Sequence, residues 1–182
     1  MISLSKVEAQ DWCRSRSIHL NDRGTPQPDF TDEQGFDFRI PIDTGGRIAL
    51  SDILFRGLPS EQDTLIWITD WGIWPSGERM HVFDRFRFSY GLDKPLVDIP
   101  AFIHRASERE DALSFFTFPI LFLYDCHVLS ESGDTWIFIS HDEVGWACVK
   151  SISRLESIKQ YKAQQDGPPN DPPRGSFMGC PV

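Results

Sequence analysis

The stretch TLIWITDW, residues 64–71, decides the fold that the sequence predicts. It is rich in β-branched and aromatic residues and nearly all apolar until Asp70. A strand that is apolar on both faces is expected inside a sheet, with both sides covered. We therefore predict an α/β domain built in layers, with α+β as the alternative, in which residues 64–71 form a central strand.

The sequence before this strand predicts two helices and one strand. Residues 4–17 are expected to form a short helix, and residues 21–35, rich in turn formers, a loop. In FDFRIPI, residues 36–42, apolar residues alternate with other types, which predicts a strand, and Pro41 favours the edge of the sheet. Residues 43–59 return to a helical period.

The sequence after the central strand first predicts two more helices. Ser76 is expected to cap a helix that carries an apolar face. Residues 92–106 contain prolines and are interpreted as a connection. Ser107 followed by Glu110 has the spacing of a capping box and predicts the start of the next helix.

The last third of the domain is predicted to contain a hairpin and a final helix. Pro119 is expected to kink the preceding helix, with a strand at 120–124 as the alternative. Residues 126–140 contain two β-rich runs around a turn, which predicts a hairpin. Asp142 is expected to cap a helix that extends to about residue 163. Together these elements predict a mixed sheet of about four strands with helices packed on it.

Length and composition predict one domain with a tail. The chain has 182 residues, of which 40% are hydrophobic and 13% aromatic, enough for a substantial core. We assign residues 1–163 to a single domain. Residues 164–182 are rich in proline and glycine and are predicted to form an irregular tail.

Charge and hydropathy indicate which classes of partner the protein could bind. The net charge of −9 argues against nucleic acid, which is bound through clustered Lys and Arg, and leaves a basic partner protein open. The sequence contains neither a signal peptide nor an apolar run long enough for a membrane span, so we expect a cytoplasmic protein that does not bind membranes. The cysteines are scattered without metal-binding spacing, so we predict free thiols: Cys13, Cys126, Cys148 and Cys180.

Asp70 is the first candidate binding residue. It follows a buried strand and is flanked by Trp71 and Trp74. A carboxylate at a strand end beside aromatic rings could act as a base, hold a metal or grip a cation. The structural alternative is that Asp70 accepts backbone hydrogen bonds in a turn while the two tryptophans pack strand against helix.

Two histidine–carboxylate combinations are the other candidates. His81 and Asp84 are spaced to share one helix face, where a carboxylate would raise the pKa of the histidine. His141, Asp142 and Glu143 follow a hydrophobic strand and could form a polar cluster at its end. The structural alternatives are a solvated helix face for the first pair, and a helix cap beside an exposed histidine for the second.

No recognised catalytic or cofactor motif occurs in the sequence. It contains no phosphate-binding loop, dinucleotide fingerprint, nucleophile elbow, metalloprotease motif or zinc spacing. We therefore predict no catalytic residue, no metal and no cofactor, and favour a binding protein over an enzyme. Cys126 and His127 are adjacent, and in a strand their side chains point to opposite faces, which argues against a thiolate–imidazole pair.

Two segments carry a resemblance to known sequences. These are ITDWGIWPSGERMHVFDRFRFSYG, residues 68–91, and ILFLYDCHVLSESGDTWIFISHDE, residues 120–143. They resemble a group of small uncharacterised bacterial proteins, to which no chemistry has been assigned. The resemblance implies a compact bacterial domain and no site residues.

The lead hypothesis is a non-enzymatic protein-binding module of the immunity-protein type, which would present carboxylates and aromatics to a basic partner such as a toxin. The rival is a hydrolase assisted by a metal or by acid–base catalysis, with a site near Asp70, His81, His141 and Asp142. It requires these side chains to converge in one cleft. A third hypothesis is an accessory subunit that docks through its tail, residues 165–182.

Overall fold

The described part of the chain forms a single antiparallel sheet with helices on both faces. The computed structural model describes residues 1–27, 34–71, 80–151, 153–156 and 158–159. The described strands are β1 (Ile2–Leu4), β2 (Gly35–Arg39), β3 (Thr64–Asp70), β4 (Ala101–His104), β5 (Asp125–Ser130), β6 (Thr135–Ile139) and β7 (Val144–Val149). The helices are α1 (Lys6–Ser15), α2 (Thr44–Arg56), α3 (Met80–Ser89), α4 (Arg109–Phe122) and the 3-10 helix η3 (Ala106–Glu108).

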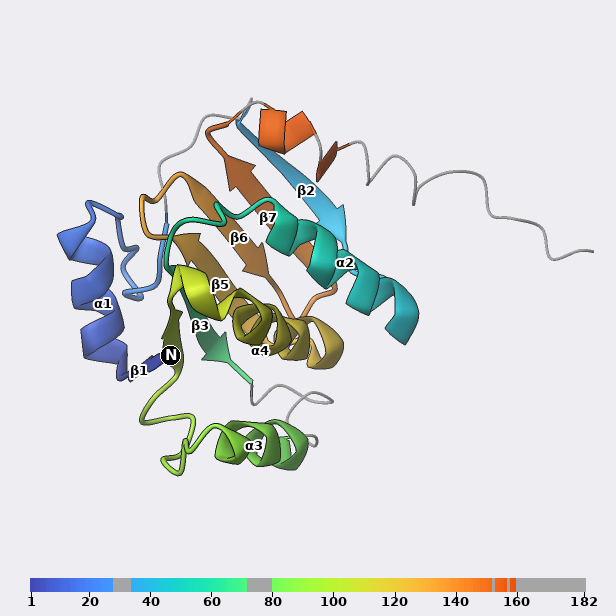
Figure 1. Ribbon diagram of the computed structural model, residues 1–182. Helices are drawn as coiled ribbons and strands as arrows, with labels where there is room; N and C mark the ends of the chain where they lie inside the picture. Colours follow the sequence, from blue (N-terminus) through green and yellow to red (C-terminus); the bar gives the residue numbers. More distant parts are fainter. Residues whose placement is uncertain (28–33, 72–79, 152, 157, 160–182) are drawn as a thin grey trace, which may run out of the picture.

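The strand order places β3 inside the sheet. The seven strands follow the order β1-β4-β3-β5-β6-β7-β2, and each neighbouring pair is antiparallel. Helix α1 lies on one face, and α2 and α4 lie on the other (Figure 1). The predicted central strand at residues 64–71 is therefore confirmed, as is the prediction that helices cover both of its faces.

Alternation along β3 divides the core in two. Leu65 and Trp67 join the smaller cluster under α1, together with Trp12. Ile66 and Ile68 face the opposite side and join the larger cluster. Each of these four β3 side chains is 0–1% exposed, and the burial of each contributes about 1.5–3 kcal/mol.

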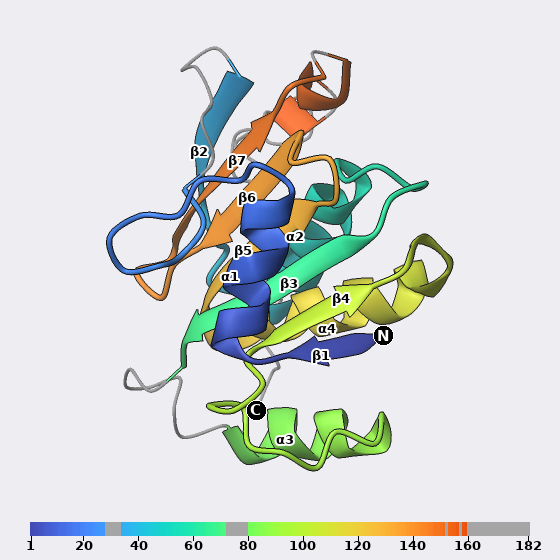
Figure 2. The ribbon, with the colours of Figure 1, turned by 90° about the vertical axis from the view of Figure 1, so that its left-hand side faces the viewer.

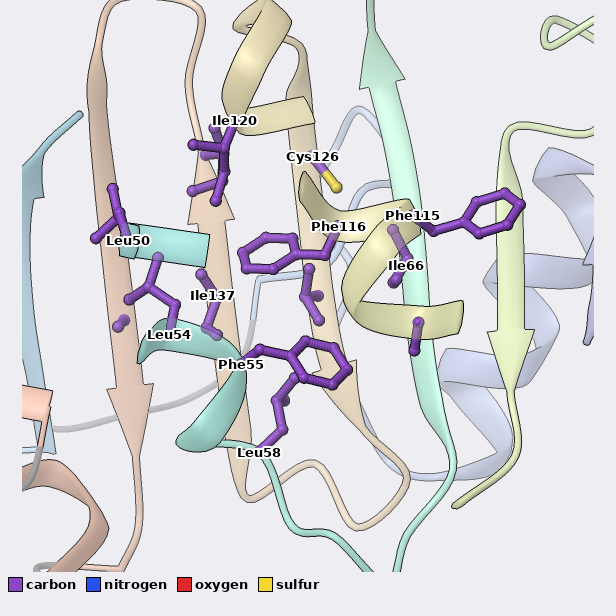
Figure 3. Close-up of a cluster of buried hydrophobic side chains, with 14 of the residues drawn as sticks. Leu50, Leu54, Phe55, Leu58, Ile66, Phe115, Phe116, Ile120, Cys126 and Ile137 are labelled. Atoms are coloured by element: carbon purple, nitrogen blue, oxygen red, sulfur yellow. The ribbon is translucent and has the colours of Figure 1, made fainter. Parts of the chain in front are cut away.

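The larger cluster joins the sheet to α2 and α4 (Figure 3). Phe55 of α2 packs against Phe116 of α4, with ring centroids 6.2 Å apart. Cys126 also belongs to this cluster, so it behaves as a small buried hydrophobe. Burial raises the pKa of its thiol, because desolvation disfavours the thiolate. Its neighbour His127 lies on the other face, as the sequence predicted.

The predicted mixed sheet of about four strands is wrong: the sheet has seven strands and is wholly antiparallel, which makes the fold α+β. Strands β1 and β4 have only three and four residues, too few to show a period of two. Strand β4 lies inside 92–106, where prolines favoured a connection. It pairs with β3 from Thr64↔His104 to Trp67↔Ala101, so tertiary pairing overrides the local signal.

Two predicted helix caps are also wrong. Before α4, the carboxylate of Glu108 accepts a hydrogen bond from the main-chain N–H of Arg105, and the predicted pair Ser107–Glu110 does not form the capping box, because η3 precedes the α-helix. Asp142 caps no helix. It lies in the turn between β6 and β7, where Glu143 takes a positive φ of 62°, and the next element is a strand. Helix α4 continues past Pro119 and ends with Leu123 in the left-handed conformation.

Other predictions are confirmed. Helices α1 and α2 lie where expected, and β2 is an edge strand. Residues 126–140 form the β5–β6 hairpin, with Gly133 at a φ of 70° in the turn. Residues 153–156 and 158–159 are helical. Ser76, Trp74 and the tail at 164–182 lie outside the described residues. Among the described helices, none is both long enough and apolar enough to cross a membrane.

Candidate functional site

One row of residues, paired across neighbouring strands, crosses the face of the sheet on which α1 lies. We use the name α1 face for this side of the sheet. The strand registers align Trp67 of β3, His127 of β5, Phe138 of β6, Trp146 of β7 and Asp37 of β2. Exposure rises along the row, from 1% at Trp67 and 6% at His127 to 41% at Trp146. Helix α1 packs over the β4–β3 end of this face, and β7 and β2 lie to one side of it (Figure 2).

The rings along this row contact one another. We use the name aromatic row for His127, Trp136, Phe138 and Trp146. The His127 and Phe138 centroids are 4.6 Å apart, and those of Phe138 and Trp146 are 5.7 Å apart with an interplanar angle of 26°. Trp136 is stacked with Phe138 at 6.2 Å and 13°. Such contacts hold the rings in place, so a partner meets a preformed apolar surface.

His127 is the buried end of the aromatic row and has a fixed protonation state. Burial lowers its pKa to about 3, so the ring is neutral at physiological pH. The indole Nε1–H of Trp136 donates a hydrogen bond of 3.1 Å to His127 Nδ1. Because Nδ1 accepts, the neutral ring carries its proton on Nε2.

Carboxylates and one histidine gather at the adjacent strand ends. We use the name acidic corner for Asp70, Asp125, His141 and Asp142. Asp70 and Asp125 are register partners on β3 and β5, next to a bulge between Ile68 and Asp70. Asp125 Oδ1 lies 2.8 Å from His141 Nδ1 and accepts a 2.7 Å hydrogen bond from the His141 main-chain N–H.

The electrostatics of the acidic corner favour a charged histidine. The hydrogen bond with Asp125 raises the pKa of His141, and Asp142 and Asp70 act in the same direction. His141 Nε2 lies 3.5 Å from Asp142 Oδ1, so both ring nitrogens face carboxylates. Because carboxylates lie at both of its nitrogens, the charged His141 ring stabilises the turn between β6 and β7.

A cleft joins the aromatic row to the acidic corner. It has a volume of about 620 Å³ and lies between the sheet and the loop that follows α1. Its sheet side is formed by Thr69, Asp70, Asp125, His127, Trp136 and Phe138. The other side consists of Lys6 and residues from Asn21 to Gln27.

The structure places the predicted site residues in three different environments. Asp70, His141 and Asp142 come together in the acidic corner, while Trp71 packs at the margin of the larger core cluster. His81 is exposed on α3. Asp84 forms an ion pair of 3.0 Å with Arg87 of the same helix, so it supports a buried arginine.

Asp125, Phe138 and Trp146 were not predicted as site residues from the sequence, where His127 was considered only as a neighbour of Cys126. The period of two in TWIFI and VGWACV could have placed the aromatic residues on one face, but the residues of β7 were predicted to belong to the helix that begins at Asp142. Asp125 belongs to the acidic corner only because β5 pairs with β3, and this pairing is not visible in the sequence. Within the described part of the chain, no group of three His, Cys, Asp or Glu side chains is arranged to hold a metal ion.

Comparison with known proteins identified no relative. No family model matches the chain, and no match was found among the curated proteins or among the solved structures. The resemblance to small bacterial proteins stays a prediction.

Proposed function

We propose that the protein is a non-enzymatic cytoplasmic binding module of the immunity-protein type. It would bind a basic protein through the α1 face, at the end formed by β7 and β2, which lies to one side of α1. The observation that carries this proposal is the aromatic row, which emerges from the core and ends at Trp146 with 41% of its surface exposed. Large rings held in place by neighbours are typical anchors of protein interfaces.

Charge determines the kind of partner. The chain carries a net charge of −9, and the acidic corner lies beside the aromatic row across the shared cleft. Arginine side chains of a partner could stack on the rings and pair with the carboxylates. A basic surface would also be steered toward this protein at low ionic strength.

The hydrolase hypothesis has one observation in its favour, the Asp125–His141 pair, which has the arrangement of a base with its orienting carboxylate. The second ring nitrogen, however, faces Asp142 rather than a hydroxyl or thiol. His81, which that hypothesis also needs, is on α3 and exposed. The geometry therefore supports binding better than hydrolysis.

A random peptide library displayed on phage tests the proposal without a known partner. The library is panned against the wild type, Trp146→Ser and the control Phe88→Ser, which removes an exposed ring from α3. We expect basic sequences to be enriched on the wild type and on the control, and to bind Trp146→Ser about tenfold more weakly. Enrichment that is equal on all three proteins, or that favours acidic sequences, would overturn the proposal.

A further inference from the structure

The cleft beneath the loop at Asn21–Gln27 has the features of a specific subsite. Trp136 and Phe138 belong both to the cleft and to the aromatic row, so the cleft continues directly from the proposed interface. The cleft also contains polar groups that the fold does not use. This combination of ring faces with unused donors and acceptors indicates recognition of a particular chemical group.

The unused donor is His127 Nε2–H. The ring is 6% exposed and lines the cleft, and its Nδ1 already accepts from Trp136. Among the described residues, none forms a hydrogen bond with Nε2, although the neutral ring carries its proton there. A buried N–H that meets only a cleft is suited to a ligand oxygen, since an unpaired donor costs about 1–3 kcal/mol.

The unused acceptor is the second carboxylate oxygen of Asp125. His141 occupies Oδ1 of Asp125, and within the described chain Oδ2 has no hydrogen-bond partner. Asp125 and His127 are two residues apart on β5, so their side chains lie on one face about 7 Å apart along the strand. The cleft therefore presents one donor and one anionic acceptor at a fixed separation.

The loop above the cleft is held in place before any ligand arrives. Asn21 Oδ1 accepts hydrogen bonds from the main-chain N–H groups of Arg23 and Thr25. Gln10 of α1 donates to the carbonyl of Gly24 at 3.1 Å. Leu20 and Pro26 form a β-bridge. A preformed site binds with a smaller loss of conformational entropy.

The charges are distributed unevenly between the rim and the interior. The charged side chains at the rim, Lys6, Asp22 and Arg23, are exposed and of both signs. The charged side chains that line the interior, Asp70 and Asp125, are half-buried and both are acids, and a charged His141 beside Asp125 balances only one of these two charges. Since buried charges are screened less by solvent, the interior favours a cation.

We infer that the cleft binds one arginine residue of the basic partner. Its guanidinium would lie against the ring of Phe138 and donate to Asp125, with Asp70 beside it. The main-chain carbonyl of the same residue would accept from His127 Nε2–H. The 7 Å spacing on β5 matches the reach of an extended arginine side chain. Lysine fits less well, because an ammonium neither stacks nor binds a carboxylate through two N–H groups.

The inference rests on the proposed function for its partner, but it has a test of its own. The probe is N-acetyl-arginine N-methylamide, titrated into protein labelled with ¹⁵N and followed by NMR at the Trp136 indole and the His127 ring. The analogues are the corresponding derivatives of citrulline, which has the same shape without charge, and of lysine. We expect saturable shifts at both signals and binding about tenfold tighter than that of either analogue.

The matched variants are Asp125→Asn and Asp11→Asn. The amide oxygen of the first can still accept from His141, and the second removes an exposed acid from α1. Asp125→Asn should abolish the preference for arginine over citrulline, whereas Asp11→Asn should keep it. Equal binding of the three derivatives to the wild type, or no shift at His127, would overturn the subsite. If peptide panning still depends on Trp146 in that case, the proposed function stands and only the arginine subsite is wrong.

Discussion

The clearest prediction concerns His104, a histidine that the fold buries. Its side chain lies on β4 and is 0% exposed, and neither ring nitrogen has a hydrogen-bond partner among the residues that the structure describes. The ring packs against Phe115, with centroids 4.9 Å apart. Burial, assisted by the charge of the N-terminus, lowers the pKa of His104 to about 4, while Glu108 and Asp111 act weakly in the opposite direction.

Such a histidine makes the folded state sensitive to mild acid. The ordinary pKa of the ring is 6.5, so below this pH the unfolded chain takes up a proton that the folded chain resists. Stability is therefore complete above pH 6.5 and decreases as the pH falls from 6.5 toward 4. For these two pKa values, the free energy of unfolding drops by about 2 kcal/mol between pH 7 and pH 5.

Substitution by phenylalanine isolates this contribution. His104→Phe keeps an aromatic ring beside Phe115 and removes the titration together with two buried polar atoms. Urea unfolding followed by tryptophan fluorescence at pH 7 and pH 5 gives the free energy for each protein. We expect the decrease with pH to be about 2 kcal/mol smaller in the variant than in the wild type.

Two other histidines set the background for this measurement. His127, whose pKa is lowered to about 3, destabilises the fold at low pH in the same direction. His141 acts in the opposite direction, because its raised pKa stabilises the fold at low pH and this contribution is lost as the pH rises. Both are present in the variant, so the difference between proteins belongs to His104. An identical profile for His104→Phe would refute the reasoning.

The remaining predictions concern stability and use the same unfolding assay. Phe116→Ala removes a fully buried ring from the larger core and should cost about 3–5 kcal/mol; a smaller loss would mean that the core collapses around the gap. Asp43→Ala removes the side chain that accepts from the N–H of Gly46 at the start of α2, and should cost about 1 kcal/mol, whereas Asp43→Asn should cost less. In Gly91→Ala the added methyl group contacts no neighbouring atom, but the residue must keep a φ of 76°. The free energy of unfolding should therefore fall by about 1 kcal/mol through backbone strain alone.

Local sequence patterns predicted the elements that carry a strong signal of their own. Residues 64–71 combine β-branched residues with two apolar faces, and burial on both sides of β3 follows from that composition. The helical period of residues 43–59 predicted α2, because a buried stripe acts within one helix, and the structure adds Asp43 as its side-chain cap. These features depend on neighbours in the chain, so they are visible without the tertiary structure.

The elements that were missed depend on partners distant in sequence. Strand β4 is stabilised by pairing with β1 and β3, and its Ala101–His104 segment has too few residues to show a period. Residues 140–143 were interpreted as a helix start because Asp142 is a good capping residue, yet the register of β7 with β6 decides the outcome. A turn that admits Glu143 at a positive φ is then the short connection that antiparallel pairing requires.

The candidate site was found only in part for the same reason. Asp70, His141 and Asp142 stood out because each follows an apolar strand, and the sheet does bring them together. The residue that joins them, Asp125, opens a strand and gains its importance from lying opposite Asp70. The aromatic row likewise arises from the registers of three strands, β5, β6 and β7. On an antiparallel sheet, a binding surface consists of residues from neighbouring strands. A sequence pattern along one strand can identify these residues one at a time. Which of them lie together, and therefore what they could bind, follows only from the strand order and register.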